Sequence, residues 1–264
     1  MVINWDYWFV FPYAVFVAVM ANASGFSGAV LFQPFFNFVL KLPIANSIAT
    51  GIATETIGMT SGALQYVRLR QVDFSALRFL LLPILVGVAA GLFLFVNVPR
   101  DILRLLVGVV ISAISLYQFL RVAKGLLGTG QTINGERLKR WTWVSVFSGL
   151  FSACTGTGVA EMNQPLLEEQ GELATKRANA TAILLEAIAD WTITIVNLKL
   201  GFLRPDILLF SATGVLIGAQ IGALISRFLP DRLLKLIFAV AVLFIGGVYI
   251  VTTVGKFLSG APLK

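Results

Sequence analysis

The chain has 264 residues, of which 58% are hydrophobic and only 12% are charged. A soluble domain carries roughly 25% charged residues, so this composition excludes a soluble globular fold and favours a protein whose outer face contacts a lipid bilayer. The formal net charge of +7 does not indicate a nucleic-acid partner, because the Lys and Arg residues lie in short loops between apolar runs, as the positive-inside rule expects.

Eight apolar runs follow one another along the chain, separated by charged residues. In order, they are Trp8–Leu40, Ile44–Val67, Phe79–Val98, Leu105–Leu120, Trp141–Ala160, Ala178–Leu198, Ile207–Ile225 and Leu236–Val254. A transmembrane helix needs about 20 apolar residues, so we predict an all-α, polytopic integral membrane helical bundle of seven to eight spans. No Lys or Arg precedes the over-long first run, so we do not expect it to be a cleaved signal peptide.

The two halves of the chain resemble each other in sequence. Gln-Pro occurs at residue 33 and again at residue 164, an offset of 131 residues. The same offset pairs Ser24-Gly25 with Thr155-Gly156 and Gly87–Gly91 with Gly218–Gly222, whereas pairing Ala45-Asn46 with Ala178-Asn179 requires two extra residues in the second half. Chance similarity of Leu-rich segments is the alternative, but it does not explain the Gly, Pro and polar matches. We therefore predict two homologous transmembrane repeats, residues 1–122 and 141–264, joined by a cytoplasmic linker at 123–140.

The first run of each half is interrupted by small and polar residues, in the stretches Met20–Pro34 and Phe151–Pro165. Gly and Pro break helices, so we predict a broken first helix in each repeat. A helix that restarts after Gly28 or Gly158 presents free N–H groups and a positive dipole end, which suit an oxyanion. Paired breaks at matching positions indicate a transporter site; the alternative is a glycine-lined helix crossing.

We expect the substrate to bind where the two breaks meet, near the middle of the membrane. Two helix N-termini that face each other form an anion site without Lys or Arg, and the core of each predicted span lacks a basic residue. The residues that we expect at this site are Ser24, Gly25, Ser27, Gly28, Gln33, Asn46, Thr155, Gly156, Thr157, Gly158, Gln164 and Asn179.

Several motifs of the chain resemble those of one known family. The glycine-rich break followed by Gln-Pro and then by Ala-Asn-Ser-Ile-Ala-Thr at 45–50 is similar to the signature of the sulfite exporter TauE/SafE family. So are Val-Asp-Phe at 72–74, Gly-Val-Ala-Ala-Gly at 87–91 and Pro-Arg-Asp-Ile-Leu-Arg-Leu-Leu at 99–106. The resemblance covers nearly the whole chain in both repeats. It implies a membrane transporter of seven or eight spans that exports or takes up sulfite, sulfonates or other small organic anions.

Acidic residues lie in the middle of the predicted spans. Glu55 shares a helix face with glycines at 51, 58 and 62, and Glu186 and Asp190 lie on one stripe of their helix with Asn179 and Asn197. A charge at the bilayer centre costs about 2.5–3.5 kcal/mol or more, so such residues are usually functional. We expect them to bind and release protons; the alternative is a protonated acid that only bonds a neighbouring helix. The proton-coupling candidates are Glu55, Glu161, Glu186 and Asp190, whereas Glu168, Glu169 and Glu172 indicate a solvated loop.

These features predict a secondary transporter of a small anion, with proton-coupled export as the expected mode and the cytoplasmic (inner) cell membrane as its location. Its expected partners are the anionic substrate, protons and the lipid bilayer. The alternatives are a passive anion channel and a membrane-embedded enzyme. The chain has no His and one Cys, no nucleophile elbow and no Walker motif, so we expect no enzyme activity, no cofactor and no metal.

The sequence leaves the topology open. If each broken run crosses the membrane once, there are eight spans and the repeats are parallel. If each broken run is a hairpin of two short helices, the repeats are inverted. The 20 Lys and Arg residues are then slightly more concentrated on the side of the linker than in the eight-span arrangement. The positive-inside rule places the linker in the cytoplasm in both arrangements. The oligomeric state is also open.

Overall fold

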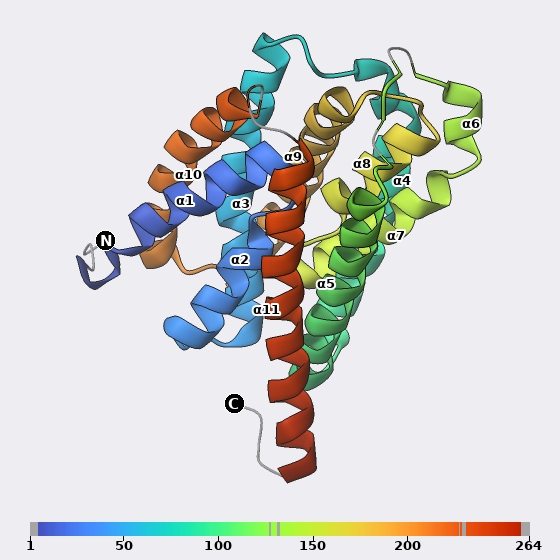
Figure 1. The fold of residues 1–264 in the computed structure, drawn as a ribbon. Helices are drawn as coiled ribbons and strands as arrows, with labels where there is room; N and C mark the ends of the chain where they lie inside the picture. Colours follow the sequence, from blue (N-terminus) through green and yellow to red (C-terminus); the bar gives the residue numbers. More distant parts are fainter. Residues whose placement is uncertain (1–4, 127, 131–132, 227, 229–230, 260–264) are drawn as a thin grey trace.

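The computed structural model describes residues 5–126, 128–130, 133–226, 228 and 231–259, with side chains at all of these except 231, 233–235, 237–238 and 256–259. Within this part the fold is entirely helical, as predicted, and it contains no strand. The helices pack into one elongated bundle (Figure 1). In chain order they are η1 (Trp5–Tyr7), α1 (Val10–Ser24), α2 (Ala29–Pro34), η2 (Phe35–Val39), α3 (Ile44–Arg68), α4 (Phe74–Asn97), α5 (Arg100–Ala123), α6 (Gly135–Lys139), α7 (Thr142–Thr155), α8 (Val159–Glu169), α9 (Thr175–Lys199), α10 (Pro205–Ile225) and α11 (Asp231–Ser259).

Several of these helices have the length and composition of membrane spans. Five described segments are long and apolar enough to cross a bilayer: Trp5–Ser24, Phe74–Asn97, Arg100–Ala123, Thr175–Lys199 and Pro205–Ile225. The shorter apolar helices are Ala29–Val39, Thr142–Thr155 and Ala239–Gly255. The fold is therefore that of a polytopic membrane bundle, as the hydropathy of the chain predicts.

The broken run of each half forms a hairpin of two short helices. In the first hairpin, the Tyr13 hydroxyl of α1 donates to the Leu31 carbonyl of α2 at 2.8 Å, and the rings of Tyr13 and Phe35 stack with centroids 4.0 Å apart. In the second, Ser145 of α7 and Asn163 of α8 are hydrogen-bonded at 2.5 Å. Residues near the start of each hairpin therefore contact residues near its end, so the two short helices of each pair run in opposite directions.

A left-handed glycine ends the first helix of each hairpin. Gly25 has φ +79° and its N–H donates to the Ala21 carbonyl, and Gly156 has φ +70° and donates to Ser152. Only glycine adopts this conformation without a steric penalty, and the left-handed φ turns the chain out of the helix while the N–H completes the last turn. The breaks predicted from the sequence are confirmed, and each turns the chain back on itself.

The two halves correspond at a constant offset of 131 residues. The helices α3, α4 and α5 start at residues 44, 74 and 100, and α9, α10 and α11 start at 175, 205 and 231. The positive φ angles repeat at the same interval, at Gly25 and Gly156, Lys41 and Glu172, and Arg70 and Gly201. The two-residue insertion inferred from the Ala-Asn dipeptides is therefore wrong. The partner of Glu55 is Glu186, and the dipeptide match was a coincidence among small residues.

Equivalent helices of the two halves run antiparallel. Along α3 and α9, Asn46 bonds the carbonyl of Phe202 just beyond α9, and Thr56 bonds Thr194 at 2.7 Å. Between α5 and α11, Gly108 lies beside Tyr249 and Ser112 lies beside Gly246. Residue numbers therefore rise along α5 as they fall along α11. The repeats are therefore inverted, with a pseudo-two-fold axis across the long helices. This selects the hairpin arrangement of the two topologies left open by the sequence.

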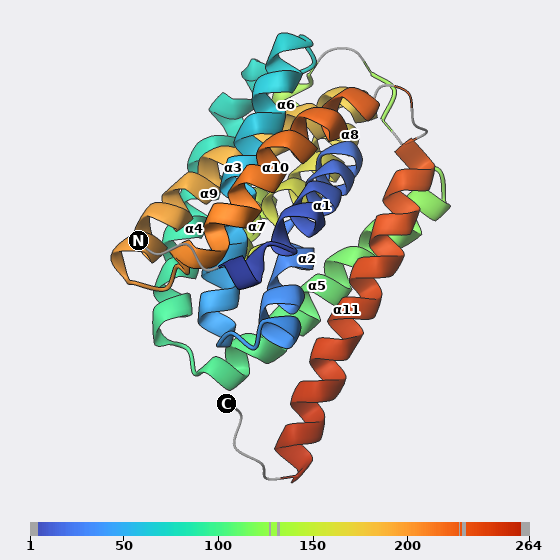
Figure 2. The same ribbon diagram turned by 90° about the vertical axis from the view of Figure 1, so that its left-hand side faces the viewer.

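The halves are also interlocked by close helix pairs. The hairpin helix α1 packs along α10 of the other half, and α7 packs along α4. Glycines make these approaches possible, because Gly87 faces the Val146 carbonyl of α7 and Gly218 faces the Val15 carbonyl of α1. Small residues at such crossings are typical of membrane helices. The helices α5 and α11 pair with each other along one edge of the bundle (Figure 2).

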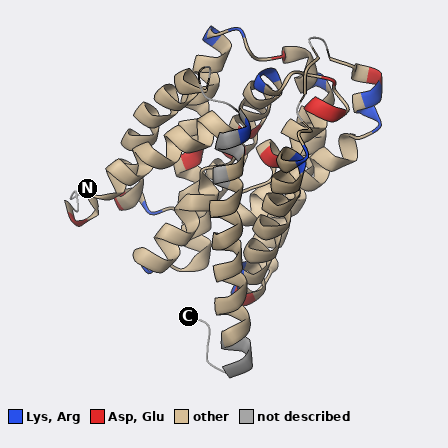
Figure 3. Cartoon of the chain, viewed as in Figure 1, with Lys and Arg blue, Asp and Glu red and all other residues tan. Residues whose placement is uncertain are grey.

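The two ends of the bundle differ in charge, and we name them from the linker. The linker face carries α6 and the α3–α4 and α8–α9 connections, because Asn134 bonds Gly171 and Arg177 pairs with Asp73. The far face carries the η2–α3, α4–α5 and α9–α10 connections. In Figure 3, most of the basic segments lie at the upper end of the bundle, around α6. Described basic residues of the linker face are Arg68, Arg70, Arg78, Arg121, Lys124, Arg137, Lys139, Arg140, Lys176, Arg177 and Arg232; those of the far face are Lys41, Arg100, Arg104, Lys199 and Arg204.

Candidate functional site

The two hairpin tips meet beside the middle of α3 and α9. At the first tip, the Glu55 carboxylate of α3 accepts hydrogen bonds from the N–H groups of Gly28 (2.6 Å) and Ala29 (3.1 Å) at the start of α2. The Ser27 hydroxyl donates to the same carboxylate at 2.6 Å. Glu55 is 3% exposed. A buried acid from a neighbouring helix therefore binds the free donors that the break creates.

A second acid joins the two tips. Glu161, in the first turn of α8, accepts the Gly158 N–H of its own hairpin at 2.9 Å and the Ser27 N–H of the other hairpin at 2.6 Å. The Ser27 hydroxyl also lies 2.9 Å from the Gly156 carbonyl. Glu161 is 1% exposed. One carboxylate and one serine thus help to hold the tips together, and none of the described Lys or Arg residues takes part in these bonds.

The sequence predicted the break amides as the anion site, and in this structure carboxylates of the chain occupy those amides. A carboxylate is chemically similar to an oxyanion, so the donors are of the kind expected. The 12 substrate-binding residues stay a prediction, because no ligand tests them. The structure shows which of these 12 residues lie close together.

Polar side chains of each hairpin reach the glycine of the other tip. A Cβ on Gly156 would meet the Gln33 amide of α2, and a Cβ on Gly25 would meet the side chains of Gln164 and Asn179. Gln33 donates to the Thr155 carbonyl at 2.5 Å. One side-chain oxygen of each of these three amides has no hydrogen-bond partner among the described residues. These groups are therefore buried at the tips with unused bonding capacity.

Three predicted side chains do not face this meeting point. The hydroxyls of Ser24 and Thr155 donate to carbonyls of their own helices, at Met20 and Phe151. Asn46 lies at the start of α3 on the far face, where it donates to Phe202. The first two stay at the tips through their backbone, whereas the structure places Asn46 well away from the breaks. Thr157, between the two glycines of the second tip, is buried.

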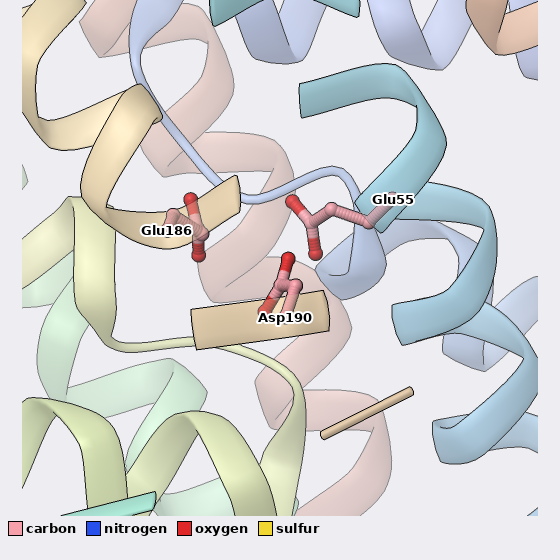
Figure 4. A group of neighbouring side chains, drawn as sticks. All are labelled: Glu55, Glu186 and Asp190. Carbon is pink, nitrogen blue, oxygen red and sulfur yellow. The ribbon is translucent and has the colours of Figure 1, made fainter. Parts of the chain in front are cut away.

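Glu55, Glu186 and Asp190 form a cluster in which one oxygen of each lies within 4.8 Å of the others. Their side chains point toward one another from α3 and α9 (Figure 4). All three are at most 3% exposed, and no described Lys or Arg forms a salt bridge with them. The three acids that the sequence places in the middle of the spans thus lie together in the interior of the bundle. We call this group the acid cluster.

The repeat partners Glu55 and Glu186 differ in their bonding. The N–H of Ala160, which corresponds to Ala29, faces Glu186. However, neither oxygen of Glu186 forms a hydrogen bond of normal geometry with a described residue. Glu161, at a position where the first half has Val30, provides the cap of α8 instead. The second half therefore contains one acid more than its helix start requires, and Glu186 is held less tightly than Glu55.

Three carboxyl groups this close cannot all be ionised without a counter-charge, because like charges at this distance repel strongly in a medium of low dielectric constant. Protons supply one solution, and the cluster can then take up and release them. Carboxylate oxygens are also the ligands that hard cations prefer, so these three residues are the ones that could hold a metal ion. Both processes bring positive charge to the same place.

A salt-bridged cluster on the linker face was missed by the sequence analysis. Arg121, near the end of α5, donates to Glu168 at 2.6 Å and to Glu169 at 2.5 Å, and both Arg121 and Glu168 are buried. The prediction that these two acids lie in a loop is wrong, because α8 continues to Glu169; Glu169 is exposed, as expected of a solvated residue, whereas Glu168 is buried. The sequence feature that could have indicated this cluster is Arg121, which directly follows the apolar run Leu105–Leu120.

The comparisons with known proteins agree with this architecture. A family model described as "Sulfite exporter TauE/SafE" matches residues 10–249 of the chain. The match includes both hairpins, the acid cluster and the linker. Searches of the curated proteins and of the solved structures found no significant match. The family assignment thus rests on the family model, and the site described above rests on the geometry of this chain.

Proposed function

The chain belongs to the sulfite exporter TauE/SafE family of membrane transporters, and on this premise we propose that it is a secondary transporter that couples the movement of a small anion to protons. The substrate class that we propose is sulfite, a sulfonate or another small organosulfur or organic anion. The proposed direction is export across the cytoplasmic membrane. The division into repeats at 1–122 and 141–264, with a cytoplasmic linker at 123–140, is part of this proposal.

The observation that carries the proposal is that carboxylates of the chain occupy backbone N–H groups of the kind that bind anions. Glu55 and Glu161 together occupy the N–H groups of Ser27, Gly28, Ala29 and Gly158. Protonation removes the negative charge that holds these carboxylates to the amides. The amides then become available to a substrate anion at a pair of positive helix ends. Proton binding should therefore increase the affinity for the anion.

The acid cluster supplies the route for the protons. Glu186 and Asp190 lie next to Glu55. At least one carboxylate oxygen of each lacks a hydrogen bond of normal geometry from a described residue. A proton can therefore move between Glu186 and Asp190 at little cost in lost hydrogen bonds, whereas its transfer to Glu55 weakens the three bonds that Glu55 accepts at the first tip. Burial of ionisable groups at this depth is otherwise expensive, which favours a functional over a purely structural role.

Export is compatible with co-binding of protons and anion. A divalent anion that moves with one proton still carries net negative charge. An inside-negative potential drives such a complex outward, with about 2.3 kcal/mol per elementary charge for each 100 mV. The direction of transport thus depends on the stoichiometry of charge rather than on the pH gradient alone.

The test is transport by purified protein in proteoliposomes loaded with sulfite. We expect efflux to rise when the side containing sulfite is acidified and to depend on the membrane potential. Glu186→Gln should abolish the dependence on the proton gradient while the protein stays folded. Efflux of the wild type that ignores the imposed proton gradient would favour the passive channel. The absence of flux for sulfite, sulfonates and small carboxylates alike would contradict the anion assignment.

A further inference from the structure

A cavity on the far face has the composition of an anion-binding site. Its volume is about 600 Å³, and Asn37, Lys41, Arg104 and Thr252 supply its polar lining. It lies between the first hairpin, the start of α5 and the C-terminal part of α11. Lys41 and Thr252 are exposed, whereas Arg104 is 7% exposed. The cavity therefore leads from the surface to a buried guanidinium group.

A second cavity shares a wall with the first. It has a volume of about 220 Å³, and Pro43 and Arg104 line both cavities. Arg100 and Asn46 add a charge and an amide to its lining, and Asp101 is its acidic member. Three of the described basic residues of the far face thus line two adjoining cavities. Positive charge in a partly enclosed space of low dielectric constant concentrates small anions.

At two of the four equivalent positions the opposite end of the bundle has an acid, whereas Arg104 corresponds to Lys235 and Thr252 corresponds to Arg121. At the offset of 131 residues, Asn37 corresponds to Glu168 and Lys41 corresponds to Glu172. Lys41 and Glu172 both have φ +58°, so they occupy the same place in the fold. Lys41 makes no salt bridge with any described residue, whereas Glu172 pairs with Arg137. The two residues therefore share a backbone position and conformation but have opposite charges.

We propose that the far-face cavity lined by Lys41 and Arg104 binds the transported anion as it enters or leaves the protein. The inference rests on the proposed anion transport and adds a site outside the hairpin tips. Arg104 presents a planar group that recognises oxyanions in a bidentate manner, and Lys41 adds a mobile charge at the entrance. The ligand class is a small sulfur oxyanion or sulfonate. At the position equivalent to Lys41 the linker face has Glu172, so this charge at the entrance is particular to the far face.

Lys41→Glu is the informative variant, because the second half of the chain already has Glu at the equivalent position with the same φ. The backbone therefore accommodates this change. We would titrate purified protein in detergent with sulfite and measure the dissociation constant by calorimetry. Lys41→Glu should raise it ten-fold or more, and Arg104→Gln should have a similar effect. Arg104→Lys should restore part of the affinity. Arg140→Gln, an exposed change on the linker face, is the matched control and should bind like the wild type.

Ionic strength adds an independent readout. At 0.5 M salt the Debye length falls to about 4–5 Å, so the difference between Lys41→Glu and the wild type should shrink. Unchanged sulfite affinity in both Lys41→Glu and Arg104→Gln, in protein that transports sulfite, would overturn the inference and leave the proposed function intact. If the wild type neither binds nor transports sulfite or methanesulfonate, the proposed function fails as well.

Discussion

Replacing Glu55 by Gln should destabilise the protein far more than the same replacement at Glu186. The two residues are repeat partners at the same depth, and both are buried. Their bonding differs, because Glu55 accepts three hydrogen bonds and Glu186 accepts none of normal geometry from described residues. The pair therefore forms an internal control, in which position and chemistry match and only the hydrogen bonds differ.

The magnitude follows from the donors at the first tip. Gln has one acceptor oxygen, and its NH₂ group is a donor. Whichever way the amide turns, it faces the N–H of Gly28 or of Ala29 with a donor and leaves one backbone group unsatisfied. Such a group costs about 1–3 kcal/mol, and the remaining bonds lose the extra strength of a charged acceptor, about 0.5–2 kcal/mol. We expect Glu55→Gln to cost about 2–5 kcal/mol and Glu186→Gln less than about 1 kcal/mol.

The assay is unfolding of each purified variant in mixed micelles, by SDS titration with helicity as the readout, at a pH near neutrality. The free energy of unfolding should fall in the order wild type, Glu186→Gln, Glu55→Gln. Equal stability of the two variants would show that the Glu55 carboxylate does not hold the tip through ionised acceptor oxygens. In that case the competition between Glu55 and the substrate for the break amides would have no basis.

Three further changes test other parts of the structure. Gly25→Val should lower stability and substrate binding, because a side chain in left-handed geometry costs roughly 1–2 kcal/mol and its Cβ would overlap polar side chains at the tip. The control Gly247→Val, whose Cβ would lie in open space, should change neither property. Thermal unfolding and sulfite titration measure both, and equal behaviour of the two variants would contradict this prediction. Arg121→Gln should cost about 3–5 kcal/mol by leaving Glu168 buried without its partner, and adding Glu168→Gln should recover part of the loss; a lone variant as stable as the wild type would mean that the bridge is not formed. Lys139→Cys should react with an impermeant maleimide only from the cytoplasmic side of cells, and labelling from outside would invert the assigned orientation.

The all-helical membrane fold and the order of its apolar runs could be predicted from the sequence, because each run must satisfy its own backbone in lipid. The breaks at Gly25 and Gly156 could be predicted for the same reason, since glycine followed by polar residues marks a helix that stops inside a span. Helical periodicity placed Glu186 and Asp190 on one stripe of their helix. These are local properties, and helix geometry alone determines them. Whether each broken run forms one span or two short helices could not be predicted.

The contacts between distant segments could not be predicted. The distance between Glu55 and Glu186 depends on the antiparallel crossing of α3 and α9, which leaves no periodic trace in either helix. The register of the repeats was misjudged because Ala-Asn occurs in both halves two residues out of phase, and small residues carry little positional information. The constant φ pattern at Lys41 and Glu172 corrected it. The hydrogen bond from the Ser27 N–H to the Glu161 carboxylate joins the two hairpins, and it can be seen only in the folded structure.

The central claim is that protons enter the acid cluster as the anion moves, and it is tested most directly without an imposed pH gradient. Proteoliposomes containing a pH-sensitive dye in a weakly buffered lumen would be loaded with sulfite, diluted into sulfite-free buffer and clamped at zero membrane potential. If protons leave with the anion, the lumen should become alkaline in step with sulfite efflux for the wild type. Glu186→Gln should show little or no alkalinisation for the same amount of sulfite released. A luminal pH that stays constant while the wild type releases sulfite, once corrected for protein-free vesicles, would contradict the account.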